Sequence, residues 1–403
     1  IVVGIELFFT QSRGGQLVFA TVLGAYFVNR YGYKLGVAIA GSMAVPMMLL
    51  GGRSDEAADQ STQERLDALD DQHTWLDTAL WAQLAEAGVV GAPLAEDVGG
   101  GGLGFAAAAL VCEQVGAHVA QVPFLETVLT ALAIDLLGTA EQRQRYLPGV
   151  AAGSSLLTAA LTETGREEPT DVAATATRDG DGFHVTGLKT SVPFADVAER
   201  VLVPARTADG TVLLLVDPAA DGVTLRAGTG TNGTPLFEVE LDGAPGELLT
   251  AEPDALGWVV DRWLTALAAT GLGVSSTALR LSASYTTTRE QFGRPVATFQ
   301  AVGHRLADAY IDVEAIRLTT LHAVWLLDSG LPGRDEARIA KWWASEGGHR
   351  VAHAAQHVHG GVGVDTDYQL HRFFTWNKQV EFTLGSAQRQ LLTLGASLAA
   401  EPV

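Results

Sequence analysis

The stretch Arg289-Glu290-Gln291-Phe292-Gly293-Arg294-Pro295 lies between two long segments with helical periodicity and is the most distinctive motif in the chain. Four segments around it repeat apolar residues at helical spacing and are predicted to be helices. They are Trp258–Thr288, Ala301–Ser329, Pro332–Gly360 and Phe373–Ala399. Long helices joined by short loops favour antiparallel packing. Residues 249–403 are therefore predicted to form a C-terminal four-helix bundle.

The sequence before this bundle has two parts, a helical part followed by a part with β-type patterning. Residues 157–248 contain short runs of β-branched and apolar residues separated by Asp-Gly pairs, a combination typical of hairpins. Helical segments rich in Ala and Leu precede them, so residues 56–156 are predicted to be an N-terminal helical domain. The predicted fold class is a multidomain α+β protein with a small central β-domain between two helical domains.

The composition sets limits on function. The chain has 403 residues, of which 47% are hydrophobic, and a formal net charge of −20 at pH 7. Such an excess of negative charge opposes charge-driven binding to nucleic acid or to an anionic membrane surface. The single cysteine, Cys112, excludes an internal disulfide and is typical of a reducing cytoplasm. We therefore expect a cytoplasmic protein that does not bind nucleic acid.

Residues 1–55 form a hydrophobic N-terminal segment that differs from the rest of the chain. Leu17–Val28 and Leu35–Leu50 are almost wholly apolar, and the basic and aromatic run Arg30–Lys34 lies between them. A helix needs about 20 apolar residues to span a bilayer, and basic and aromatic residues favour the membrane–water interface. The segment is therefore either a membrane hairpin, attaching the protein through residues 1–53, or a pair of buried core helices.

The same region resembles a short part of the bacterial O-antigen ligase/polymerase membrane family. The resemblance rests on Thr10–Gly15 and Gly51–Ser54, with Ser61 and Arg65 downstream, and covers residues 1–67. It implies a fusion in which this segment carries no activity by itself. One function hypothesis is accordingly a membrane-associated glycan-ligase fragment fused to a second domain.

Five motifs occur together in the remainder of the chain, from about Thr74 to the C-terminus. In chain order they are Pro93–Gly100, Leu161-Thr162-Glu163, Gly187-Leu188-Lys189, residues 289–300 and His359-Gly360-Gly361-Val362-Gly363. In this combination the chain resembles the acyl-CoA dehydrogenase family. The resemblance implies a β-barrel-like central domain between the two helical domains.

The resemblance also implies a flavoenzyme that uses FAD to oxidise the Cα–Cβ bond of an acyl-CoA thioester. The α-hydrogen beside a thioester is a very weak acid. The carbonyl must therefore be polarised, and a base must lie against the α-carbon in a dry site. The flavin accepts the β-hydrogen as hydride, while the protein provides position and electrostatics.

The family likeness further implies which residues contact FAD. In this family the Arg-x-x-Phe-Gly stretch of one subunit binds the FAD of its neighbour, so we expect a homo- or heterotetramer. A guanidinium fork suits a diphosphate, and a glycine lets the backbone approach a cofactor closely. The expected FAD contacts are Arg289, Gln291, Phe292, Val296, Gln300, His357, Gly360, Gly361, Ser386, Gln388 and Thr162.

The residues at the two base positions of the family cannot accept a proton. Where the family has the glutamate of its Tyr-Glu-Gly-Thr-x-Gln stretch, this chain has Leu384. In members whose base lies on the long helix before the Arg-x-x-Phe-Gly stretch, the corresponding residue here is Trp263. Asp261 is two residues away and therefore on a different helical face. The identity of a catalytic base is left open.

The part of a flavin pocket that this chain would contribute to its own FAD is also altered. Thr164–Asp171 lacks the Gly-Ser pair of the family, and Lys189-Thr190-Ser191 lacks the indole and the threonine expected beside the flavin. Because the segment that serves a neighbour's FAD is intact, one hypothesis is a non-catalytic subunit of a heteromeric dehydrogenase. Such enzymes act in actinobacterial steroid side-chain catabolism, and fatty-acid catabolism is a further option. The alternative is a homotetramer that is active through an atypical base.

Three histidines, His349, His353 and His357, recur at four-residue spacing and would line one face of a helix. No acidic residue is in helical register with them, and the family likeness assigns His357 to FAD. We therefore expect no metal site.

Overall fold

The computed structural model describes residues 63–70, 74–166, 168–180 and 182–400. The chain divides into two units, residues 1–72 and 73–403. In the first unit, residues 63–70 are helical. The predictions for the hydrophobic segment, residues 1–55, and for a membrane hairpin within it lie outside the described residues. Among the residues that the structure does describe, no helix is both long enough and apolar enough to cross a bilayer.

The second unit begins with four helices. They are α5 (Thr78–Glu86), α6 (Gly104–Ala117), α7 (Phe124–Leu137) and α8 (Ala140–Ala151). Side chains cap two of them: Asp77 accepts from the Leu80 N–H at 2.8 Å, and Thr139 and Gln142 form a reciprocal capping box. Helix α7 is buried along most of its length, so it forms the centre of this layer.

The central domain is a β-domain, as predicted, and eight strands form its sheet in the described residues. They are β1 (Leu157–Ala159), β2 (Thr162–Glu163), β3 (Thr175–Asp179), β4 (Gly182–Pro193), β5 (Arg200–Thr207), β6 (Gly210–Val216), β7 (Val223–Thr229) and β8 (Pro235–Thr250). The pairings β3–β4, β4–β8, β8–β6, β6–β5 and β5–β3 close a ring of five strands. The expected β-barrel is thereby confirmed, and its closure removes the exposed edges of those five strands.

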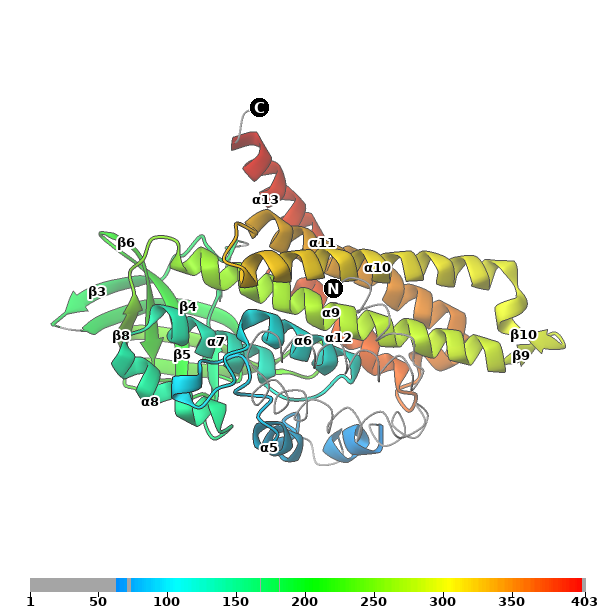
Figure 1. Cartoon of the computed structure of the whole chain (residues 1–403), viewed down its shortest axis with the longest axis horizontal. Helices are drawn as coiled ribbons and strands as arrows, with labels where there is room; N and C mark the ends of the chain where they lie inside the picture. Colours follow the sequence, from blue (N-terminus) through cyan, green and yellow to red (C-terminus); the bar gives the residue numbers. More distant parts are fainter. Residues whose placement is uncertain (1–62, 71–73, 167, 181, 401–403) are drawn as a thin grey trace, which may run out of the picture. The chain divides into compact units, whose positions relative to one another are not determined.

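The C-terminal part is a helical bundle, shown in yellow-green to orange-red in Figure 1. Its helices are α9 (Ala255–Thr288), α10 (Gln300–Asp328), α11 (Arg334–His359) and α12 (Leu370–Phe382). Helices α6 and α9 cross at two glycines: a Cβ on Gly116 would lie 2.0 Å from the Thr270 carbonyl oxygen, and one on Gly273 would lie 1.9 Å from that of Glu113. Only glycine permits this approach, which joins the N-terminal helices to the bundle.

The prediction of one helix over Phe373–Ala399 is wrong. Helix α12 ends at Phe382, and a separate helix, α13 (Ala387–Ala400), follows. The chain turns because Leu384 and Gly385 both have positive φ, of 56° and 95°. The buried ammonium group of Lys341 stabilises the turn by donating to the carbonyl oxygens of Glu381 and Gly385, at 3.3 and 3.1 Å. Helix α13 therefore leaves the bundle at an angle, as Figure 1 shows in red.

The motif at residues 289–295 forms a small hairpin of two strands, β9 (Glu290–Gln291) and β10 (Arg294–Pro295). Phe292 and Gly293 form its turn, with φ of 55° and 77°. The hairpin follows the C-terminal end of α9, whereas the barrel precedes the N-terminal end of the same helix. Because α9 has 34 residues, the helix alone separates the two by about 50 Å. Figure 1 shows the barrel and the hairpin at opposite ends of the bundle.

Candidate functional site

The residues expected to contact FAD fall into two groups at the two ends of the bundle. The hairpin-end group lies around β9, β10 and the C-terminal end of α11. It contains Arg289, Gln291, Phe292, Val296, Gln300, His357, Gly360 and Gly361. The barrel-end group contains Thr162 on β2, together with Ser386 and Gln388 at the start of α13. Leu384 and Trp263, which occupy the two base positions of the family, also lie at the barrel end.

At the hairpin end, polar and aromatic side chains project from the protein. Arg289 and Gln291 are exposed, and Phe292 at the turn is 93% exposed. Among the residues that the structure describes, no ion pair involves Arg289. The Arg294 guanidinium lies 4.1 Å from the centroid of the Phe299 ring and so supports the base of the hairpin. The Arg289 guanidinium and the Phe292 ring are therefore exposed at the surface, where a ligand or another subunit could contact them.

The second part of the hairpin-end group is the glycine turn after α11. Gly360 has φ 63° and ψ −138°, a conformation that only glycine adopts readily. A Cβ on Gly360 or on Gly361 would meet no atom within 4 Å, whereas one on Gly363 would lie 2.6 Å from the Gln356 carbonyl oxygen. The turn is therefore packed on one side and open at its two leading glycines. This arrangement leaves room for a cofactor to approach the backbone.

A ring contact that no sequence motif predicts joins these two parts. The rings of Tyr285, on the last turn of α9, and His359, the last residue of α11, are stacked with centroids 4.4 Å apart. His359 was recognised as part of a motif, but Tyr285 lies 74 positions away in the sequence. No local pattern could have paired the two residues.

The barrel end offers no proton acceptor at either base position. Leu384 is buried and has positive φ, which is unusual for a bulky residue. Trp263 is also buried, and its indole N–H has no hydrogen-bond partner among the described residues. Neither side chain can take up a proton, so a thioester placed here would lack the base that the chemistry requires.

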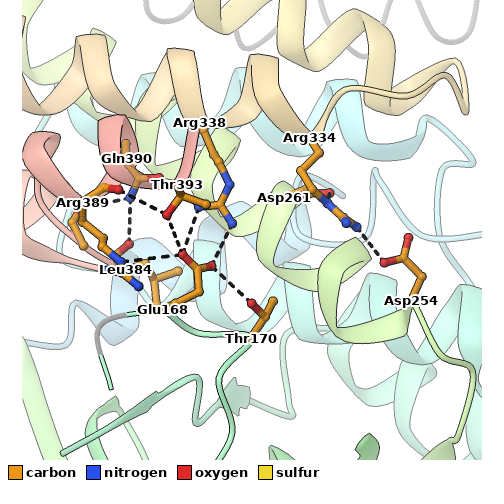
Figure 2. A network of polar contacts seen from close by, with 11 residues as sticks. Glu168, Thr170, Asp254, Asp261, Arg334, Arg338, Leu384, Arg389, Gln390 and Thr393 are labelled. Carbon is orange, nitrogen blue, oxygen red and sulfur yellow. Dashed lines mark hydrogen bonds and ion pairs between the residues drawn. The ribbon is translucent and has the colours of Figure 1, made fainter. Parts of the chain in front are cut away.

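Asp261 is the nearest carboxylate in sequence to the helix base position. Its Oδ2 lies 3.3 Å from the Arg334 Nε, and Arg334 also binds Asp254 at 2.7 Å. Burial raises the pKa of Asp261, and the charge of Arg334 opposes that rise. Figure 2 shows Asp261 directed at Arg334, so its carboxylate is engaged within the protein.

The barrel end instead holds a buried ionic network centred on Glu168, shown in Figure 2. The two carboxylate oxygens of Glu168 accept from Arg338 at 2.8 and 3.3 Å, and Thr393 donates to the same carboxylate at 3.0 Å. Arg338 also donates to Gln390, which in turn donates to the Leu384 carbonyl oxygen at 3.1 Å. The loop that replaces the flavin-binding Gly-Ser stretch is therefore tied to the position of the missing base.

No local sequence pattern marks Glu168 or Arg338 as site residues. They are 170 residues apart, and each is an ordinary charged residue in its local context. The signal that exists is weak: Arg338 interrupts the buried side of α11, on which Ala337 and Ala340 are fully buried.

Lys189, in the Gly187-Leu188-Lys189 motif, links strand β4 to strands β2 and β5. The Lys189 ammonium is almost fully buried and donates to Glu163 at 2.6 Å and to the Pro204 carbonyl oxygen at 2.7 Å. Glu163 also accepts from the backbone N–H groups of Ala173 and Ala174. Burial alone would raise the pKa of Glu163, but these donors lower it. The hydroxyl of Thr162 donates to the Thr190 carbonyl oxygen, so this side chain is already bound within the sheet.

The three spaced histidines have separate environments. His349 contacts Lys378 at 2.7 Å and Glu381 at 3.2 Å, His353 packs against His349 and Phe374, and His357 is exposed at the hairpin end. Within the described part of the chain, no three His, Cys, Asp or Glu side chains are grouped in a way that could hold a metal ion.

Comparison with known proteins identifies the family. The acyl-CoA dehydrogenase N-terminal domain model matches residues 53–154, and the C-terminal domain model matches residues 261–399. The acyl-CoA dehydrogenase FadE27 of Mycobacterium tuberculosis is 39% identical over 368 residues, covering 88% of this chain and 97% of that protein. The resemblance to O-antigen ligases finds no support, since Arg53, Ser54, Ser61 and Arg65 fall within the match to the dehydrogenase N-terminal domain.

Two solved structures have a similar fold over most of the chain. A variant of the Tcur3481–Tcur3483 steroid ACAD has a TM-score of 0.81 and 46% identity, covering 84% of this chain and 94% of that chain. The ChsE4–ChsE5 complex from Mycobacterium tuberculosis has a TM-score of 0.77 and 36% identity, covering 87% of this chain and 99% of that chain. The predicted fold class is confirmed, and FAD is the cofactor of the enzymes it resembles. The chain belongs to the acyl-CoA dehydrogenase family of FAD-dependent oxidoreductases.

Proposed function

We propose that this chain is the non-catalytic subunit of a heteromeric acyl-CoA dehydrogenase and completes the FAD site of a catalytic partner subunit. The observation that carries the proposal is the contrast between the two ends of the bundle. The hairpin end exposes groups that suit a cofactor held by a neighbour. The barrel end has hydrophobic residues at both base positions and an internal ion pair in the loop next to them.

The hairpin end has the chemistry to bind the dinucleotide part of FAD. The Arg289 guanidinium would bind the diphosphate through charge-assisted hydrogen bonds, and Phe292 offers an aromatic face for a ring. Gly360 and Gly361 leave space for a cofactor against the backbone. Bound FAD would supply the hydride acceptor, while this chain's residues would hold it in place for the partner.

The barrel end supports the non-catalytic role. A base that removes an α-proton must be titratable and within hydrogen-bond reach of the substrate. Leu384 and Trp263 are not titratable. Glu168, which Arg338 and Gln390 link to the Leu384 carbonyl oxygen, is bound by Arg338 and Thr393. Its lone pairs are already committed to donors of this chain, so a substrate would have to displace them.

The proposed partner is a homologous subunit, and the proposed substrate is the CoA thioester of a steroid side chain. Two of the most similar solved structures are described as a ChsE4–ChsE5 complex and a Tcur3481–Tcur3483 steroid ACAD, and both descriptions name two proteins. At 46% and 36% identity, these are closer in sequence than the butyryl-CoA dehydrogenase of Megasphaera elsdenii at 24%. Oxidation of a fatty acyl-CoA remains the broader alternative within the same chemistry.

The test is purification of this chain alone, of its homologous partner alone and of the two co-expressed, with FAD content and steroid-CoA oxidation measured for each. We expect the co-expressed complex to bind FAD and turn over, and this chain alone to do neither. Loss of turnover when the partner's own base is changed to glutamine would locate catalysis in the partner. Stoichiometric FAD and acyl-CoA oxidation by this chain alone would overturn the proposal.

A second candidate, an active homotetramer with an atypical base, is favoured by one observation. Asp261 is a buried carboxylate two residues from Trp263 in sequence, and burial raises its pKa. The variant Asp261→Asn in a homomeric preparation tests it. Turnover that falls by more than about a hundredfold supports this candidate, and turnover that does not change removes it.

A further inference from the structure

One residue touches both segments of the hairpin end. The Tyr285 ring stacks on His359 at an interplanar angle of 23°, and its hydroxyl donates to the His359 carbonyl oxygen at 3.4 Å. The Tyr285 carbonyl oxygen accepts the Arg289 N–H at 2.8 Å, which ends α9 and starts the hairpin. Tyr285 therefore connects the residue before the Gly360 turn to the first residue of the hairpin.

The hydrogen bonds of His359 define its tautomer. Its side chain is almost fully buried, and Nδ1 lies 2.7 Å from the Ala355 carbonyl oxygen. A carbonyl can only accept, so Nδ1 carries the proton. Burial lowers the pKa of His359 and so favours the neutral ring, in which Nε2 is the acceptor when Nδ1 carries the proton. The Tyr368 hydroxyl lies 3.4 Å from Nε2 and donates to it.

Tyr368 closes the cluster from the other side of the glycine turn. Its ring centroid is 5.4 Å from that of His359 and 6.4 Å from that of Tyr285. The residues on both flanks of the turn, His359 before it and Tyr368 after it, are therefore held by the same three rings. Gly360 and Gly361 have no side chains of their own with which to restrain the backbone, so the turn depends on its flanks for a fixed position.

We propose that Tyr285, His359 and Tyr368 form a positioning cluster that sets the spacing between Arg289 and the Gly360–Gly361 turn. The inference rests on the proposed function and deepens it. A dinucleotide that bridges Arg289 and the glycine turn binds well only if both segments are held in register beforehand. None of the three side chains needs to touch the cofactor, because the cluster acts through the backbone on each side of it.

The experiment uses the complex with the catalytic partner subunit, stripped of FAD and titrated with FAD under flavin fluorescence. Tyr285→Leu and His359→Leu remove the stack, and we expect each to weaken FAD binding about tenfold, since small displacements of positioned groups have large effects. Tyr285→Phe keeps the stack and loses only the 3.4 Å hydrogen bond, so its effect is expected to stay within about threefold. At saturating FAD the KM for acyl-CoA is expected to match that of the unmodified complex.

Tyr146→Phe provides the matched control. Tyr146 is buried, and its hydroxyl donates to Glu247 at 2.7 Å, so the variant loses a stronger hydrogen bond at a site between α8 and the barrel. We expect it to lower the thermal midpoint without changing FAD affinity. If Tyr285→Leu and His359→Leu behave in the same way, with lower stability and unchanged FAD affinity, the cluster is only a packing contact and the proposal is overturned.

A second measurement needs no partner. The ¹⁵N chemical shifts of the His359 ring in the chain alone are expected to show a proton on Nδ1 and none on Nε2, and a proton on Nε2 instead would overturn the proposal. A wild-type complex that binds no FAD would overturn the proposed function and the positioning role with it. A wild-type complex that binds FAD, combined with variants that bind it equally well, would overturn the positioning role alone.

Discussion

The hairpin end and the barrel end of the bundle carry similar kinds of residues but use them in opposite ways. At the hairpin end, Arg289 and Phe292 are exposed and the turn at Gly360 is open. At the barrel end, Arg338 is 5% exposed and its guanidinium is bound to Glu168. Arg289 is exposed to an external anion, whereas Arg338 is already paired with the Glu168 carboxylate.

Under the proposed function, this difference would let the chain keep one half of a shared site without the other. An exposed cation with no internal partner stays available for an external anion. A buried one needs an anion permanently, because an uncompensated buried charge is strongly destabilising. Once Glu168 satisfies Arg338 from within the chain, the region no longer depends on a ligand for its stability. The following variants test this contrast.

The largest expected effect is the loss of stability in Glu168→Ala. Removing the carboxylate leaves the Arg338 guanidinium buried without its partner, which costs about 3–5 kcal/mol of unfolding free energy. Urea unfolding with circular dichroism measures it. The double variant Glu168→Leu with Arg338→Met is expected to recover most of the loss, since it removes both charges. Equal losses in the single and double variants would show that packing, and not the charge pair, stabilises the barrel end.

The second-largest expected effect is weaker FAD binding when Arg289 is removed. Arg289→Ala is expected to weaken FAD binding by the partner complex about tenfold to a hundredfold, the contribution of a charge-assisted hydrogen bond to phosphate. Because Arg289 is exposed, the thermal midpoint of the chain alone should not change. Arg178→Ala is the control, since Arg178 is also exposed and lies over the Phe183 ring at 5.0 Å on the barrel. Reduced FAD affinity in the control would point to a general loss of positive charge.

A pH effect at the barrel end is expected from Lys341. Burial lowers the pKa of its ammonium from 10.5 to about 7. Between these values the unfolded chain binds a proton that the folded chain does not. The free energy of unfolding therefore rises with pH across this window, by up to about 1.4 kcal/mol per pH unit, and is unaffected by this group below it.

Lys341→Met lacks the titrating group and retains all the others. Between pH 7 and 10 the unfolding free energy of the wild type should rise relative to that of Lys341→Met. Denaturant titrations at a series of pH values measure it. A constant difference would mean that Lys341 stays protonated in the folded chain.

The smallest expected effect is on catalysis. Leu384→Glu restores a carboxylate at the family's base position, yet we expect the chain alone to oxidise no acyl-CoA, because the Glu168 loop is still bound to Arg338. Measurable turnover by this variant would show that the missing base is the sole defect of the barrel end.

Much of the fold could be predicted from local patterns. Helical periodicity located α9, α10 and α11 to within a few residues. Asp-Gly pairs marked the β3–β4 and β5–β6 hairpins, whereas Asp242-Gly243 lies within β8 and not at a turn between strands. The periodicity of the last helical segment did not predict the break at Leu384 and Gly385. Gly385 is a local signal for a helix end, and Lys341 then supplies donors for the freed carbonyl groups from another helix.

The sequence by itself determined the order of the elements, the intact hairpin motif and the absence of a carboxylate at Leu384 and Trp263. These are properties of a residue and its near neighbours. Only the tertiary structure decided that Glu168 binds Arg338 and that Tyr285 packs on His359. The physical reason is that burial and desolvation belong to the environment that distant segments create together. The same arginine side chain is a free ligand site or a satisfied core group according to what the fold places beside it.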